Sequence, residues 1–169
     1  AKNKSHQRGR IVGCIVEGGV MWPAVGAVRT EDGILVKDSF LSPSCRQFAI
    51  DKGYLRRFPL ITHHGAAATL GEPYRNYYHR LADSIPRIYA LYHPACATLG
   101  PVRLFVDDRF SGEELRVIRH LVPHYVEVDV TDSAVRVRAD QCLYLPHLSD
   151  DRTNYSRWFN ASAGFIPIE

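Results

Sequence analysis

The apolar run VRLFVD at residues 102–107 constrains the fold of this chain more than any other stretch. It has no polar alternation, which is typical of a parallel strand buried on both faces. Ser111 and Glu114 follow as an S-x-x-E capping box, which predicts a helix over residues 112–122. YVEVDV then reads as a second strand. Strand, helix, strand is the βαβ unit, so we expect a parallel sheet with VRLFVD at its centre and the helix packed on it.

Other segments supply further elements. RIVGCIV (10–16) and GILVKDSF (33–40) have the β-branched content of strands, with a TEDG turn between them. PLIT (59–62) predicts a buried strand that runs into a loop, HHGAAATLGEP, whose small residues allow close approach of a ligand. RVRAD and QCLYLP complete the set. The predicted fold is α/β, three-layered and Rossmann-like, with a β-rich N-terminal extension.

Length and composition predict one domain. The 169 residues, 46% hydrophobic and 23% charged, suit a single globular core. Residues 1–10 are basic without any acid and predict a disordered tail, residues 11–148 form the α/β domain, and residues 149–169 are a C-terminal tail or the start of a linker. The net charge of +3 is mild, so no nucleic-acid partner is predicted. No run approaches the ~18 to 20 apolar residues of a membrane span, so no integral span is predicted.

The cysteines argue against a metal or redox motif. Cys14, Cys45, Cys96 and Cys142 stand singly, and the absence of a CxxC pair excludes a zinc ribbon or a thioredoxin-like site by spacing. We expect four small buried residues in a reducing compartment. No cofactor is predicted.

Residues 76–91, NYYHRLADSIPRIYAL, predict one amphipathic helix with Asn76 as its N-cap. Pro86 removes a helix hydrogen bond and predicts a kink. A projection at ~100° per residue separates two sides. The apolar side holds Tyr77, Leu81, Ile85, Ile88 and Tyr92, and the opposite side holds Asn76, His79, Asp83 and Arg87, with Arg80 beside them.

The polar side of this helix has two interpretations. His79 and Asp83 are four residues apart, a spacing that brings a base next to a carboxylate that can orient it. The same spacing also suits a solvated face with weak ion pairs. The loop that carries His63 and His64 precedes the helix, and ligands of open α/β sheets lie beyond the carboxyl ends of strands. Both interpretations stay open on spacing alone.

The order of these residues resembles a known signature. Asn76-Tyr77-Tyr78-His79, then Asp83, then Pro86-Arg87 is similar to the N-[YF]-x-H-W-x-x-D-x-[LI]-P-R pattern of glycosyltransferase family 61, the capsular polysaccharide biosynthesis type. The surrounding elements agree from about residue 11 to 148. Arg80 stands where the family usually has Trp. Members of the family look like two-domain GT-B enzymes whose second half carries the donor site, and this chain is similar to the N-terminal, acceptor-side half.

The resemblance implies inverting hexosyl or pentosyl transfer from a nucleotide sugar to a saccharide or glycan acceptor, in polysaccharide biosynthesis. One of His79 and Asp83 would act as the base, with the other orienting it. The partners of the chain would be the saccharide acceptor and a nucleotide-sugar donor held by a second domain outside this chain. The isolated chain would be inactive. Cytoplasm is favoured, or the Golgi lumen in a eukaryote. The expected substrate-binding residues are Asn76, Arg80, Arg87, His63 and His64, with no metal.

Three alternatives stay open. In the first, the chain has kept the fold and lost the chemistry, as a non-catalytic carbohydrate- or protein-binding domain, which its nine tyrosines would suit. Asp107 and Asp108 follow a strand and could hold Mg²⁺ or a ribose, although loop capping explains them as well. His120 and His124 have the i,i+4 spacing of metal ligands, but Pro123 between them favours surface histidines.

Overall fold

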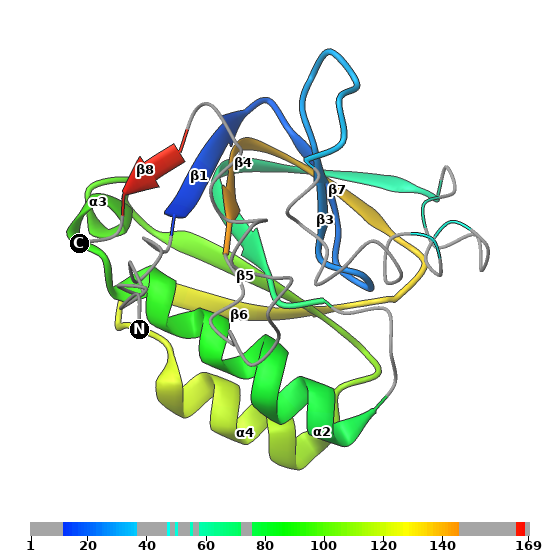
Figure 1. The fold of residues 1–169 in the computed structure, drawn as a ribbon, viewed down its shortest axis with the longest axis vertical. Coiled ribbons are helices and arrows are strands. Elements are labelled where there is room, and N and C mark those ends of the chain that lie inside the picture. The colour runs from blue at the N-terminus through cyan, green and yellow to red at the C-terminus, as the bar shows by residue number, and fades with distance from the viewer. Residues whose placement is uncertain are drawn as a thin grey trace, which may run out of the picture.

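The computed structural model describes most of the predicted domain, and Figure 1 draws it as a ribbon. The predicted basic tail at residues 1–10 lies outside the described residues. The described part is a mixed α/β structure with one eight-stranded sheet, which confirms the α/β class. The described residues are 12–36, 47, 50, 55, 58–71, 76–145 and 165–167.

Four strands form the parallel part of the sheet in the spatial order β6-β5-β4-β7. β5 has a parallel neighbour on each side, which confirms that VRLFVD is central. β4, β5 and β6 lie side by side in the order of the chain, and β7 then pairs with the other edge of β4. The strand order therefore reverses between β4 and β7, at the position where open α/β sheets bind ligands beyond the strand ends. The strands are β4 (Leu60–Thr69), β5 (Val102–Asp107), β6 (Val126–Thr131) and β7 (Arg136–Tyr144).

The remaining strands extend the sheet from the other edge of β7. β1 (Val12–Glu17) and β2 (Val20–Trp22) run antiparallel to β7 one after the other, and Gly18 between them takes a positive φ of 59°. β3 (Ala27–Arg29) pairs with β2. β8 (Phe165–Pro167) pairs with β1, so this part of the segment expected as a tail or linker joins the sheet.

The sheet bends within β4. Its pairing with β7 shifts register between His63 and Ala66, and Gly65 takes a φ of 116° there. Before this point β4 pairs only with β7, and after it β4 also pairs with β5. Figure 1 shows that β4 and β7 turn sharply. The register shift explains the turn, because a bulge bends a strand and increases its twist. The bend brings the antiparallel strands over one face of the parallel ones.

The helices cover the opposite face (Figure 1). The capping box of Ser111 and Glu114 is formed, and the predicted helix packs through Ile118 on β5, as expected. The segment after Asn76 is helical, as predicted, but it changes winding twice. The helices are α2 (Tyr77–His79), the π-wound η2 (Arg80–Ser84), the 3₁₀-wound η3 (Ile85–Tyr92), α3 (Pro94–Ala97) and α4 (Gly112–Leu121).

The described residues therefore form three layers, but the third layer is made of strands. Ala66, Ala68 and Leu104 face the helices, whereas Ala67 and Phe105 face the antiparallel strands. Alternate residues of a strand point to opposite faces, so β5 and the last part of β4, from Ala66, are buried on both sides. The core against the strands also contains Met21, Val28, Val137, Ala139 and Cys142.

Several predictions about strands were wrong. PLIT leads into β4, but it is not buried, since Leu60 and Ile61 are 39% and 43% exposed. HHGAAAT is part of β4 and not a loop, because its alanines fit between two layers that approach both faces of the strand. RVRAD and QCLY form one long strand, β7. Of the predicted strand at 33–40, Leu35 makes an isolated bridge to Arg29, and residues 37–40 lie outside the described residues.

Candidate functional site

His79 and Asp83 are in direct contact. His79 Nδ1 lies 2.7 Å from Asp83 Oδ2, and the two side chains are 23% and 12% exposed. An ionised carboxylate can only accept a hydrogen bond, so the imidazole proton belongs on Nδ1 and the lone pair on Nε2. The pair therefore has the geometry of a base and its orienting partner.

The polar side of the helix is turned partly inward, which corrects the projection. Asp83 and Arg87 from that side are buried. On the apolar side Ile85 and Ile88 are buried as predicted, whereas Tyr77, Leu81 and Tyr92 are exposed. The winding of η2 contributes to this change, since the Ile85 N–H bonds to the Arg80 carbonyl five residues back. A π turn holds more residues than an α turn, so it rotates every later side chain away from its position in a 100° projection.

Arg87 lies inside the protein. Its side chain is among the most buried of the described residues, at 1% exposure. Nε donates to the Leu145 carbonyl at 2.7 Å and Nη1 to the Gly71 carbonyl at 3.4 Å. Leu145 directly follows β7 and Gly71 closely follows β4, so the guanidinium joins the two strand ends where the strand order reverses.

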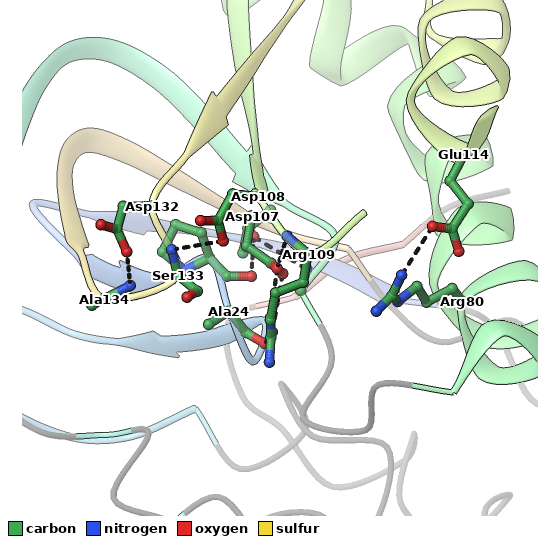
Figure 2. Close-up of polar contacts among 12 residues, drawn as sticks. Ala24, Arg80, Asp107, Asp108, Arg109, Glu114, Asp132, Ser133 and Ala134 are labelled. Atoms are coloured by element: carbon green, nitrogen blue, oxygen red, sulfur yellow. Dashed lines mark hydrogen bonds and ion pairs between the residues drawn. The ribbon is translucent and has the colours of Figure 1, made fainter. Parts of the chain in front are cut away.

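Arg80 joins the same helix to α4. Its Nη1 lies 2.9 Å from Glu114 Oε2 (Figure 2). Its guanidinium lies 5.1 Å from the centre of the Phe110 ring. Glu114 is buried and also accepts the Ser111 N–H at 2.7 Å within the capping box. One carboxylate thus begins α4 and holds Arg80. Asn76, the other predicted substrate ligand on this helix, uses its side-chain oxygen to accept the Tyr78 N–H at 2.9 Å.

His63 and His64 do not reach His79. The His63 ring lies edge-on to Phe105, with centroids 5.8 Å apart, on the sheet face that the antiparallel strands cover. His64 is exposed and lies 3.7 Å from Asp140 of β7. A loop would have placed both residues near the helix N-terminus. Instead, both lie within β4, which continues to Thr69 before the helix begins.

The protein's own backbone lies next to the position where the strand order reverses. The turn between β2 and β3 packs against the end of β4, and Thr69 Oγ1 donates to the Pro23 carbonyl at 3.4 Å. A Cβ on Gly71 would overlap Pro23, and one on Gly26 would overlap the Gly71 carbonyl. Two glycines 45 residues apart thus make this contact possible, and no local signal in the sequence pairs them.

The aspartates after β5 serve the loop that contains them (Figure 2). Asp107 is buried and accepts from Arg109 through the backbone N–H at 3.0 Å and the side-chain Nε at 2.6 Å. Arg109 also donates to the Ala24 carbonyl in the β2–β3 turn. Asp108 accepts the Ser133 N–H at 3.2 Å. These bonds match the loop-capping interpretation.

Other candidate groups are separate from this region. His120 and His124 are both exposed, and His124 lies beyond the end of α4. Among the described residues, no group of three or more His, Cys, Asp or Glu side chains is placed to hold a metal ion. Cys142 is buried in the core, whereas Cys96 is half-buried and burial raises the pKa of its thiol. Within the same part of the chain, no helix has the length and apolar character to cross a membrane.

Compared with protein-family models, curated proteins and solved structures, the chain has no significant match. Its function is therefore inferred from the residues and contacts described above.

Proposed function

We propose that this chain is the acceptor-side domain of an inverting glycosyltransferase, which transfers a sugar from a nucleotide sugar to a saccharide acceptor in polysaccharide biosynthesis. The contact between His79 and Asp83 is the observation that carries the proposal. The β6-β5-β4-β7 order supports a Rossmann-like half-domain of a GT-B enzyme, since its parallel strands have the same order as those in the first part of a doubly wound sheet.

His79 is the base in this proposal. A sugar hydroxyl is a weak nucleophile, so it needs a proton acceptor within hydrogen-bond reach as its oxygen attacks the anomeric carbon. Nε2 of His79 takes that proton, while Asp83 keeps the Nδ1 proton and stabilises the imidazolium. The bond from the anomeric carbon to the diphosphate breaks as the new bond forms, and the diphosphate leaves with the electron pair. Asp83 suits the orienting role better because it is the more buried of the two.

The donor would bind through a second domain outside this chain. The β2–β3 turn packs against the carboxyl end of β4, so the protein's own backbone lies on one side of the usual position for a nucleotide in such a sheet. This packing favours the acceptor-side assignment over a domain that holds the donor by itself.

The test uses the parent polypeptide that contains this domain and a donor half. Transfer from a panel of nucleotide sugars to saccharide acceptors would be measured for wild type, His79→Ala and Asp83→Asn. Loss of the base is expected to reduce the rate by ~10² to 10⁴. His120→Ala is the matched control, because this histidine is exposed and lies in the last turn of α4, away from the pair of His79 and Asp83, here called the dyad. Wild-type rates in both dyad variants would refute the catalytic assignment.

A second candidate is a non-catalytic carbohydrate- or protein-binding domain. The observation that favours it is a set of tyrosines, each 56–69% exposed, on the helix that carries the dyad. Exposed aromatic rings suit binding surfaces because they combine apolar area with a polar hydroxyl. Binding of a glycan that is unchanged in His79→Ala, with no detectable transfer by the parent polypeptide, would favour this candidate. The tyrosines are Tyr77, Tyr78, Tyr89 and Tyr92.

A further inference from the structure

The helix that carries His79 and Asp83 is poorly held by its own backbone. It passes from α to π to 3₁₀ winding within 16 residues, and Pro86 has no N–H to donate. Such segments have weaker and less regular hydrogen bonds than a continuous α-helix. Contacts with the rest of the protein must therefore fix the direction in which the dyad points.

Two arginines supply those contacts on either side of Asp83: Arg87 is buried, and the side chain of Arg80 is 12% exposed. Arg80, three residues before it, forms the ion pair with Glu114 at 2.9 Å and lies over Phe110. Arg87, four residues after it, donates to the carbonyls of Leu145 and Gly71. The first contact ties the helix to α4, and the second ties it to the ends of β7 and β4.

We propose that Arg80 and Arg87 are positioning residues that hold the π-wound turn around Asp83 and thereby keep the proton of His79 on Nδ1. The catalytic meaning of this role rests on the proposed function, but the positioning itself does not. Both arginines were expected to bind substrate, but Arg87 is buried in the interior and the partly buried Arg80 is paired with Glu114.

The chemistry of the two anchors explains why arginine stands at both positions. The guanidinium of Arg87 directs separate N–H groups at two carbonyls that belong to different strands, which a single ammonium would match poorly. Arg80 combines an ion pair with stacking over an aromatic ring, and the planar guanidinium suits both. Loss of either anchor frees one end of η2, so the Asp83 carboxylate would no longer stay at 2.7 Å from Nδ1.

The experiment measures the tautomer of His79 in the 169-residue chain by long-range ¹H–¹⁵N NMR, without any substrate. Wild type is expected to hold the neutral imidazole as the Nδ1–H form. In Arg80→Met and Arg87→Met, that population should fall by about half, toward the mixture of an unpartnered imidazole. Arg87→Lys should give an intermediate population, because a lysine can restore the charge but not both directed bonds.

Two controls calibrate the measurement. Asp83→Asn removes the carboxylate and defines the signal of a lost dyad. Arg116→Met removes an exposed arginine of α4 that pairs with Glu113, so it should leave the His79 signals unchanged.

A His79 tautomer that stays at its wild-type value in any folded Arg80 or Arg87 variant would overturn the role of that arginine. If the methionine variants do not fold, Arg87→Lys and Arg80→Lys provide the same comparison. A changed tautomer without any glycosyl transfer in the parent polypeptide would uphold the positioning role and refute the proposed function, so the two failures are distinguishable.

Discussion

At the scale of single residues, this domain has an unusual number of charges in its interior. Four ionisable side chains of the described part are buried, and each has a partner: Asp83 with His79, Arg87 with main-chain carbonyls, and two carboxylates with arginines. Buried charges cost several kcal/mol in free energy unless they are paired, so each pair depends on its geometry. The two carboxylates are Asp107 and Glu114.

The burial of Asp83 predicts that Asp83→Asn lowers stability. The substitution keeps the shape but weakens a charged hydrogen bond, so the free energy of unfolding should fall by about 1.5–3 kcal/mol. Chemical denaturation of the isolated chain measures this change. Glu113→Gln, which affects only an exposed ion pair, should change stability by less than about 0.5 kcal/mol. Equal changes in the free energy of unfolding for the two substitutions would mean that the buried pair stabilises the fold no more than the exposed pair does.

Cys96 predicts that stability declines at alkaline pH. Burial raises the pKa of its thiol. The pKa of Tyr125 is also raised, mainly by burial and to a smaller extent by repulsion from Cys96 and Tyr92. A pKa that is higher in the folded than in the unfolded state gives stability that is complete below the unfolded value of about 8.5 for Cys and is lost as pH rises through the folded value. Melting temperatures between pH 7 and about 10 should fall less steeply in Cys96→Ser than in wild type. Identical slopes would contradict this source of the decline.

At the scale of elements, α4 forms as its local sequence predicts. Ser111 accepts the Glu114 N–H at 3.2 Å and Glu114 accepts the Ser111 N–H, so both halves of the capping box are made. The glutamate has a second task, since it also pairs with Arg80. The start of α4 and the orientation of the dyad helix are therefore linked through one side chain.

We expect Ser111→Ala to lower the free energy of unfolding by about 1 kcal/mol, because it removes the side-chain acceptor at the N-cap. Circular dichroism during urea unfolding gives the value. Ser133→Ala is the control, because its backbone N–H provides the bond to Asp108 and survives the substitution. The capping account would fail if Ser111→Ala were as stable as Ser133→Ala.

At the scale of the whole molecule, the bend in β4 and β7 decides the architecture. It brings β2 and β3 over the parallel strands, and the turn between them reaches the end of β4. The layer that doubly wound sheets build from helices is made here from strands. The same arrangement places backbone beside the position where such sheets bind nucleotides.

Substitution of Gly71 tests this contact directly. Gly71→Ala should destabilise the fold by at least about 3 kcal/mol or prevent folding, because the added Cβ would overlap the Pro23 backbone. Gly112→Ala is the matched control, since open space surrounds that position, and it should be neutral or stabilising by up to about 1 kcal/mol. Soluble yield and thermal melting compare the two. A stable Gly71→Ala variant would mean that the turn can move away from the strand ends.

The packed end of β4 also predicts weak nucleotide binding. Calorimetry of the isolated chain with uridine or cytidine diphospho-sugars should detect at most millimolar affinity, because Pro23 and Gly71 are packed together at the end of β4, next to the position where the strand order reverses. A dissociation constant in the micromolar range would contradict the assignment of the donor to another domain.

The local sequence alone determined the elements whose signals are local. The apolar run of β5, the capping box of α4 and the Asn76 cap are confirmed because each depends on neighbours within a few residues. The contact of His79 with Asp83 also follows from i,i+4 spacing. These features would be expected in almost any fold that contains the same segments.

Only the tertiary structure decided which way those segments face. Arg87 is buried because carbonyls from two distant strand ends meet at its guanidinium, and nothing within the helix specifies them. HHGAAAT is a strand because a layer packs on each of its faces, so its alanines fit there as core residues. The physical reason is the same in both cases: burial depends on partners that are far apart in the chain, and local periodicity carries no record of them.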